Sequence, residues 1–452
     1  EYKTPDRVKF TSLAQAKEID DLRKRIKFLY HSKDEAGEFY REMFSDIFSY
    51  VSNRIPEISD ETYRIDQAMK AGFGWKLGPF EIWDAIGTQA AYDKAIELGR
   101  DIAPWVKEML NQGTSSFYQI EVDAMNYFDK EEKQYKALPN QEALIDLYVR
   151  KKANTIWKSD VASLIDLGDD VVNLEFHSKM NAVGGDTLQA IQHAIDLTED
   201  NYKGLVIANQ AQNFSVGANL AMIFMMAVEQ DYDELDFAVR NFQQTTQKIR
   251  YSNIPVIAAP HAMTLGGGCE IAMHADITQA AAETYMGLVE MGVGLIPGGG
   301  GTKEMALRAS ALFNQGDIQN PLIRKLFLNV GMAKVSTSAH EAMDLGLLRK
   351  GIDAISVNKQ RRIADAKAAV IGLADKGYRA PANEKKIKIL GKQILGSFLV
   401  GADSMFHAGF ITEYEKLISE KLGYVIAGGD LSAPTLVSEQ YLLDLEREAF
   451  LS

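Results

Sequence analysis

The chain has 452 residues, of which 46% are hydrophobic and 25% charged, and its net charge is −13 at pH 7. This length is enough for two or three domains, and the composition is typical of an ordinary soluble globular protein. The acidic balance argues against a nucleic-acid partner. The single cysteine, Cys269, excludes an internal disulfide and agrees with a reducing compartment, so we expect a cytoplasmic protein.

The start of the sequence and its apolar runs give no sign of export or membrane insertion. The chain begins at Glu1 rather than at methionine, so we expect a piece of a longer protein or a processed product. No signal-peptide pattern follows. The longest apolar run, residues 220–228, is too short to span a bilayer. The seven histidines are scattered without metal-ligand spacing, so no metal site is predicted.

The first quarter of the chain has the spacing of amphipathic helices. Apolar residues recur at helical intervals in 14–30 and 39–51. The glycines and Pro79 within 71–80 predict that one helix ends there and another begins. From 111 to 160 the sequence turns polar and charged, which suggests a linker with one helix.

From about residue 168 the pattern changes to alternating strands and helices. Helical stretches over 185–199 and 233–250 separate short runs rich in β-branched residues. This alternation predicts crossover units and an α/β core. A capping box at Ser338 opens a short helix, and beyond Val357 the chain is again helical to its end. The predicted strands are 171–176, 204–208 and 255–259.

Two glutamates stand beside glycine clusters inside apolar sequence. Glu270 ends the run 265–270, and Glu290 precedes the glycine-rich run 296–302. A carboxylate in apolar surroundings is costly unless it has a partner or a task. Taken singly, Glu270 at a helix start has a structural explanation, because anions are favourable there. Together, two such carboxylates are the parts needed to move protons at a carbonyl compound.

Two further segments place free backbone N–H groups near these glutamates. Gly217 lies in a strand-to-helix turn within 213–219, and the triplet 266–268 forms a second turn. Each segment alone is more often a plain turn. Together they can supply two N–H donors to one developing oxyanion.

Residues from about 168 to 350 resemble the crotonase (enoyl-CoA hydratase/isomerase) superfamily. The resemblance implies an α/β crotonase (ClpP/crotonase-like) core of β-β-α repeats. The segments that carry it are Lys179-Met-Asn-Ala182, Phe214-Ser-Val-Gly-Ala-Asn219, Gly266-Gly-Gly-Cys-Glu270, and Glu290 followed by Ile296-Pro-Gly-Gly-Gly-Gly-Thr302.

The resemblance also implies roles for individual residues. Hydratases of this family use two glutamates, which match Glu270 and Glu290. The implied oxyanion-hole and substrate-binding positions are Ala218, Gly267, Gly298 and Val216, with the N–H groups of Ala218 and Gly267 as the two donors. The implied substrate is a coenzyme A thioester, with no organic cofactor and no metal in this chain.

The N-terminal part resembles one helical repeat of the C-terminal region of 3-hydroxyacyl-CoA dehydrogenases. The matching residues are 65–69 and 72–84, and no dinucleotide-binding G-x-G-x-x-G occurs in the chain. The order of parts is that of bacterial bifunctional β-oxidation enzymes. The resemblance therefore implies a missing N-terminal dehydrogenase portion, with NAD as the cofactor of the full-length enzyme.

We expect an all-α N-terminal domain, an α/β core and a helical C-terminal extension. The expected activity is hydration of trans-2-enoyl-CoA to 3-hydroxyacyl-CoA. A Δ3-Δ2 enoyl-CoA isomerase and a catalytically silent scaffold for the dehydrogenase are the alternatives, and a homo-oligomer is left open. The expected boundaries are 1–110 for the dehydrogenase-type repeat, 111–167 for a linker with one helix, 168–350 for the crotonase domain and 351–452 for the extension.

Overall fold

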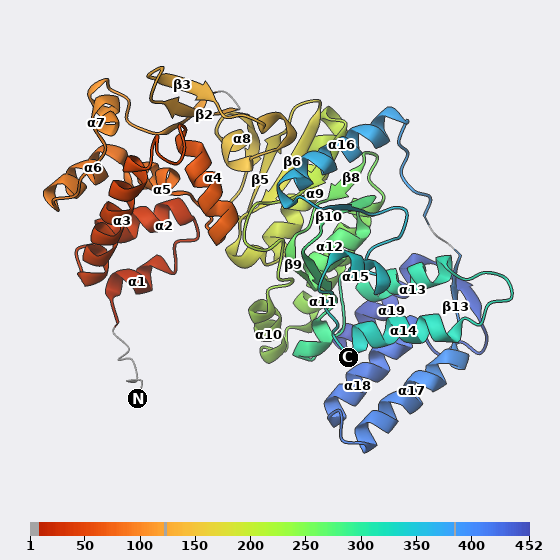
Figure 1. The fold of residues 1–452 in the computed structure, drawn as a ribbon. Helices are drawn as coiled ribbons and strands as arrows, with labels where there is room; N and C mark the ends of the chain where they lie inside the picture. The colour runs from red at the N-terminus through yellow and green to blue at the C-terminus, as the bar shows by residue number, and fades with distance from the viewer. Residues whose placement is uncertain (1–8, 122–123, 384–385) are drawn as a thin grey trace. The chain divides into compact units, whose positions relative to one another are not determined.

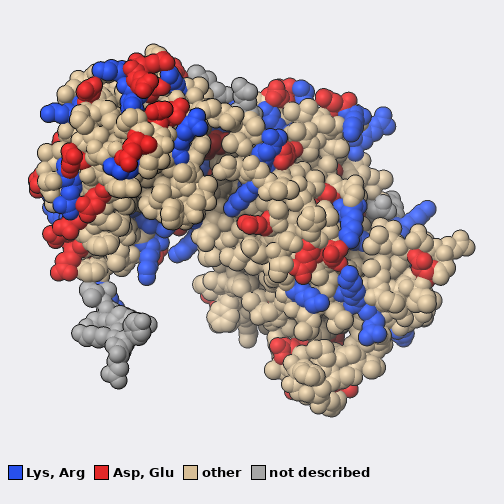
Figure 2. All heavy atoms as spheres, viewed as in Figure 1, with Lys and Arg blue, Asp and Glu red and all other residues tan. Residues whose placement is uncertain are grey.

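The computed structural model describes residues 9–121, 124–383 and 386–452. They form two compact units, Glu1–Gln141 and Glu142–Ser452, each with its own hydrophobic core (Figure 1). Among the described residues, no helix is long and apolar enough to cross a membrane. On the face shown in Figure 2, acidic and basic side chains are interspersed, and no continuous basic surface forms there.

Helices of the first unit pack around a cluster of aromatic side chains. Phe48 stacks on Trp83 with ring centroids 4.4 Å apart, and Phe80 and Phe117 pack against the same indole. Such rings bury much apolar surface at low entropic cost. Up to residue 111 the described part is helical, as expected. The helices are α1 (Thr11–Ala16), α2 (Leu22–His31), α3 (Glu35–Asn53), α4 (Thr62–Phe73), α5 (Pro79–Ile86), α6 (Thr88–Glu97) and α7 (Pro104–Asn111).

The predicted linker is wrong for residues 118–137, which form a three-stranded antiparallel sheet of the first unit. The charged run 129–133 is the turn between two of its strands: the Asp129 carboxylate accepts the N–H groups of Glu131 and Glu132 at 2.9 Å. A turn needs polar residues as much as a linker does, so composition did not separate the two. The strands are β1 (Tyr118–Glu121), β2 (Ala124–Asp129) and β3 (Gln134–Ala137).

The second unit is built on a seven-stranded sheet in the order β12-β10-β8-β7-β6-β5-β4. The pairs β4-β5 and β5-β6 are antiparallel, and the strands from β6 to β12 pair in parallel. Because β4 and β5 belong to this sheet, the unit starts well before the predicted boundary at residue 168. The strands are β4 (Thr155–Lys158), β5 (Ala162–Asp166), β6 (Val171–Phe176), β7 (Gly204–Ile207), β8 (Val256–Ala258), β10 (Ile277–Ala281) and β12 (Ala354–Ser356).

Helices cover both faces of this sheet. In β6, Val172 and Leu174 join the main core with α9, whereas Val171 joins a second core with Val370 of α16. All six residues of β6 are buried, including the polar Asn173 and Glu175, as expected of a strand that is covered on both faces. The helices up to this point are α8 (Leu147–Asn154), α9 (Gly185–Asn201), α10 (Leu220–Val228), α11 (Tyr232–Arg250), α12 (Gly267–His274), α13 (Gly301–Ala311), α14 (Asn320–Gly331), α15 (Ala339–Asp344) and α16 (Arg362–Asp375).

The C-terminal part is mostly helical, as expected, but it is not an appendage after residue 350. It supplies the edge strand β12, and α16 covers one face of the sheet. Its last helices pack on α13, α14 and α11. They are α17 (Lys392–His407), α18 (Glu413–Ala427) and α19 (Glu439–Leu451), with the short antiparallel pair β13 (Ile387–Ile389) and β14 (Thr435–Val437).

Candidate active site

Glu270 is carried by a sharp strand-to-helix turn. Strand β9 (Ala262–Leu265) pairs with β11 (Thr284–Gly287), and α12 follows at once. Between β9 and α12, Gly266 has φ +49° and ψ −124°, a conformation that side chains disfavour. A methyl group on Gly266 would also lie 2.9 Å from Glu290 Oε1. The turn therefore needs glycine, and it brings the two glutamates of the predicted site close together.

The carboxylate of Glu270 is buried and holds the glycine-rich turn 297–301. Its Oε1 atom accepts the N–H groups of Gly299 at 2.9 Å and of Gly301 at 2.8 Å. Gly301 is the first residue of α13, so the carboxylate also lies at the positive end of that helix. These amides favour the charged form of Glu270.

Glu290 has the opposite environment. It opens the 3-10 turn Glu290–Val293 after β11, and its Oε2 atom is buried without a hydrogen-bond partner among the described residues. Burial raises the pKa of Glu290 to about 7, and the nearby Glu446 carboxylate adds to the rise. A buried carboxyl oxygen with no donor favours the neutral acid.

The two glutamates titrate as a pair. Burial, Glu290 and Glu446 together raise the pKa of Glu270 well above its ordinary value, against the pull of the Gly301 and Gly299 amides. Two like charges this close share a proton near neutral pH. Within the pair, the two amide hydrogen bonds favour the charge on Glu270, and the unpartnered oxygen favours the proton on Glu290.

Two backbone N–H groups near this pair have no acceptor among the described residues: those of Ala218 and Gly267. Around Ala218, Val183 donates to Gly217 O at 2.8 Å and accepts from Asn219 N at 3.1 Å, which turns the N–H of Ala218 away from Val183. A methyl group on Gly267 would lie 3.5 Å from Ala218 N. The structure thus brings the two predicted donors to adjacent backbone positions.

The other two predicted positions lie on the same segments. Val216 is partly exposed and precedes Gly217, whose φ of +97° suits glycine. Gly298 lies beside the amides that hold Glu270 but is not one of them. A methyl group on Gly298 would lie 3.0 Å from Phe450 Cδ2, so this glycine allows the close approach of α19.

Sequence reasoning missed Glu446 of α19. Its carboxyl group is fully buried, and it accepts the N–H groups of Gly300 at 2.6 Å and of Lys303 at 3.0 Å. The available signal was two glutamates seven residues apart, Glu439 and Glu446, with leucines between them on an otherwise apolar helix face. Residues seven apart lie on the same face of a helix, so both glutamates share the face that carries the leucines and not the solvent-facing side.

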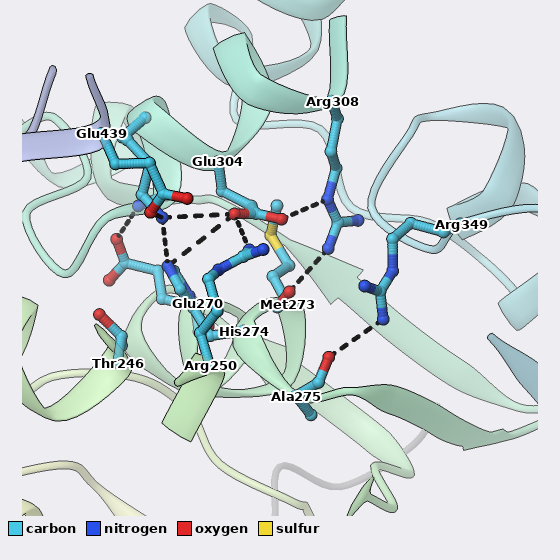
Figure 3. A network of polar contacts seen from close by, with 12 residues as sticks. Thr246, Arg250, Glu270, Met273, His274, Ala275, Glu304, Arg308, Arg349 and Glu439 are labelled. Atoms are coloured by element: carbon cyan, nitrogen blue, oxygen red, sulfur yellow. Dashed lines mark hydrogen bonds and ion pairs between the residues drawn. The ribbon is translucent and has the colours of Figure 1, made fainter. Parts of the chain in front are cut away.

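A network of buried charges joins α12, α13 and α19 behind the site (Figure 3). Lys303 Nζ lies 2.9 Å from His274 Nε2 and 3.2 Å from Glu439 Oε2. Burial lowers the pKa of His274 well below its ordinary value, so the ring is neutral, donating from Nδ1 to the Glu270 carbonyl at 2.7 Å. Glu304 pairs with Arg250, and with Arg308 at 2.9 Å. Charges buried this deeply are retained only when each is paired.

Helix α10 follows the Ala218 loop and is almost entirely apolar, yet none of its residues is buried. The apolar side chains of this helix are therefore not part of the core of the described chain. Phe224 and Val228 are more than 60% exposed. Within the described residues, no group of three His, Cys, Asp or Glu side chains can hold a metal ion.

Two parts of the chain match known protein families. Residues 168–311 match the family described as enoyl-CoA hydratase/isomerase, and residues 44–116 match the 3-hydroxyacyl-CoA dehydrogenase C-terminal domain. The first match confirms the predicted crotonase core and contains Glu270 and Glu290. Glu446 lies outside it.

Individual relatives are similar over different lengths. A Bacillus subtilis protein named "Probable 3-hydroxyacyl-CoA dehydrogenase" is 46% identical over all of this chain and 56% of its own length. A Clostridium acetobutylicum "Short-chain-enoyl-CoA hydratase" is 30% identical over 40% of this chain and 65% of its own. A solved enoyl-CoA hydratase from Bacillus anthracis aligns with 59% of this chain and 90% of its own at TM-score 0.38 and 21% identity.

The chain spans about half the length of the first curated relatives it matches. Residues 168–311 are thus similar to the enoyl-CoA hydratase/isomerase family, and residues 44–116 are similar to the 3-hydroxyacyl-CoA dehydrogenase C-terminal domain.

Proposed function

We propose that the second unit hydrates trans-2-enoyl-CoA to 3-hydroxyacyl-CoA. The observation that carries the proposal is the buried pair of glutamates in unlike environments. Glu270 accepts two amide hydrogen bonds, whereas Glu290 has a carboxyl oxygen with no partner among the described residues. One charged and one neutral carboxyl are the base and the acid that addition of water requires.

The reaction follows from these positions. The N–H groups of Ala218 and Gly267 would hold the thioester oxygen, each contributing roughly 3–4 kcal/mol as negative charge develops there. Glu270 would remove a proton from water as its oxygen bonds to the β-carbon. Glu290 would give its proton to the α-carbon, so the double bond becomes a single bond and no redox partner is needed. General acid–base help of this kind is worth about 10²–10⁴-fold.

Both alternatives fit the site less well. An isomerase moves one proton between two carbons of the same substrate and needs a single carboxylate, which leaves the second glutamate unexplained. In a silent scaffold, a buried carboxyl group with an unpartnered oxygen would destabilise the fold and serve no function. The glutamate pair therefore favours hydration.

For the whole protein we propose a second activity, NAD-dependent oxidation of the 3-hydroxyacyl-CoA product. The support is the dehydrogenase C-terminal domain at 44–116 and the name of the Bacillus subtilis relative. No dinucleotide fingerprint occurs in this sequence, so NAD would bind in a part of the protein beyond this chain. This chain alone should form no NADH from a 3-hydroxyacyl-CoA. NADH formation by the pure chain would contradict that assignment.

The test of the proposed function is an assay of the purified chain with two substrates. With crotonyl-CoA, hydration is followed by loss of the enoyl thioester absorbance; with a trans-3-enoyl-CoA, isomerisation is followed by its appearance. We expect activity on the first substrate that disappears in Glu270→Gln and Glu290→Gln. The exposed Glu283 provides the control variant Glu283→Gln, which should keep full activity. Activity on the 3-enoyl substrate alone would favour the isomerase, and no activity on either would favour the scaffold.

A further inference from the structure

The C-terminal helix α19 lies against the glycine turn of the site. In Figure 1, α19 is labelled next to α13, the helix that the turn opens, and residues at helical spacing on one face of α19 reach the turn. A methyl group on Gly300 would lie 3.5 Å from Leu443 Cδ2, and one on Gly298 would lie 3.0 Å from Phe450 Cδ2. Glu446 lies between these two contacts in sequence. Gly298 and Gly300 of the turn therefore pack on α19, although α19 lies outside the matched residues 168–311.

The amides of this turn are divided between two carboxylates. Those of Gly299 and Gly301 donate to Glu270 of α12, while that of Gly300, together with that of Lys303, donates to Glu446 of α19. Alternate N–H groups of one short backbone segment are thus held by α12 and by α19. Because the segment is short, a shift of one carboxylate also moves the N–H groups that donate to the other carboxylate.

Charge links Glu446 to the site as well. Its negative charge raises the pKa of both Glu270 and Glu290. The charged groups that interact with Glu446 are Lys303 on α13, Glu270 on α12 and Glu290 on the 3-10 turn. Lys303 in turn interacts with Glu304, His274, Glu439 and Arg250.

We propose that Glu446 is a positioning residue of this site: by holding the amides of Gly300 and Lys303, it fixes the turn that orients Glu270 for proton transfer. The inference rests on the proposed hydratase function. It makes α19 part of the active site, so the site needs residues from the end of the chain as well as from the matched domain.

The experiment compares three glutamates of the same helix in the full chain. Glu446→Gln keeps the side-chain size but removes the charge and one acceptor oxygen. We expect kcat for crotonyl-CoA to fall on the order of 10–100-fold with KM changed less than about threefold. Glu439→Gln is the matched buried control, because Glu439 bonds Lys303 Nζ and Tyr251 Oη but no amide of the turn. It should lower the melting temperature with little effect on kcat. The exposed Glu448 gives the surface control Glu448→Gln, which should change neither.

The pH profile separates positioning from simple support. Removing the charge of Glu446 lowers the pKa of both Glu270 and Glu290. In a plot of kcat/KM against pH, the limbs set by these two groups should therefore both move to lower pH in Glu446→Gln. Glu446→Asp keeps the charge and should return the limbs toward their wild-type positions. A purely structural role would lower the melting temperature and leave the limbs in place.

A second readout does not depend on turnover. Carboxyl ¹³C resonances of Glu270 and Glu290, identified by loss in the two glutamine variants, should titrate at lower pH in Glu446→Gln. The inference is overturned if these titrations do not move, or if Glu446→Gln keeps wild-type kcat or loses it only as Glu439→Gln does. Absence of hydratase activity in the wild-type chain would instead refute the proposed function, and the titrations would still decide the role of Glu446.

Discussion

Each unit of the chain buries a pair of carboxyl groups, and the two pairs differ in how their oxygens are satisfied. In the first unit, Asp66 accepts the N–H groups of Phe80 and Glu81 and the hydroxyl of Tyr118. Asp84 accepts from Phe117 N, Tyr118 N and the Thr88 hydroxyl, each at 2.8 Å. In the second unit, Glu290 has a buried oxygen with no partner among the described residues. The N–H groups of Ala218 and Gly267, which have no acceptor among those residues, lie nearby.

The pKa values alone do not separate the two pairs. Burial raises the pKa of Asp66 and of Asp84 to about 7, the same value that Glu290 reaches. The aspartates tie the sheet of the first unit to α5, and every oxygen is used in doing so. A perturbed pKa marks a candidate site only together with an unsatisfied group and room for a reacting atom.

The largest expected effect is on the pair in the second unit. Glu270→Gln and Glu290→Gln should each lower kcat for crotonyl-CoA by about 10²–10⁴-fold, because each removes one proton-transfer group. The melting temperature should stay nearly unchanged, since glutamine fills the same space. Near-wild-type turnover of crotonyl-CoA by either variant would show that its glutamate has no such role.

The corresponding change in the first unit should act on stability instead. Asp84→Ala leaves the buried amides of Phe117 and Tyr118 without an acceptor, which costs about 1–3 kcal/mol for each. Urea unfolding followed by tryptophan fluorescence is suitable, because three of the four tryptophans lie in this unit. The exposed Asp93 offers the control Asp93→Ala. If Asp84→Ala lost hydratase activity at unchanged stability, the carboxyl pair of the first unit would not be purely structural.

The same pKa of about 7 should appear in different measurements for the two units. With Glu290 as the proposed acid, kcat/KM should fall up to tenfold per pH unit above about pH 7, and Glu290→Gln should abolish this limb of the pH–rate profile. For Asp66 and Asp84 the folded-state pKa is raised above 3.8, so the folded first unit binds more protons than the unfolded chain between about pH 4 and 7. Its unfolding free energy should therefore decrease as pH rises through that window and level off above it.

The smallest effect concerns α10, beside the proposed oxyanion donors. We predict that one exposed face of this helix borders the acyl chain, where methionines adapt to chains of different length. Ala221→Trp or Ala227→Trp should then lower activity on a long enoyl-CoA several-fold more than on crotonyl-CoA. Ala227→Ser is the small control. Equal losses on both substrates with a lower melting temperature would contradict this role.

Local spacing in the sequence was enough to predict the central residues of the candidate site. Gly266 and Gly217 are needed where the backbone takes positive φ, and Glu270 and Glu290 follow at short, readable distances from such turns. The alternation of apolar runs likewise predicted the α/β core, because strand and helix periods are properties of neighbouring residues. These features need no knowledge of distant contacts.

Long-range packing decided the rest. Three features depend on which segments meet after folding. Glu446 binds the same turn as Glu270, β4 and β5 extend the sheet, and α10 stays exposed. A buried glutamate on α19 and a solvent-facing one look alike in sequence, since both suit a helix; what separates them is the set of amides that another part of the chain brings within hydrogen-bond distance.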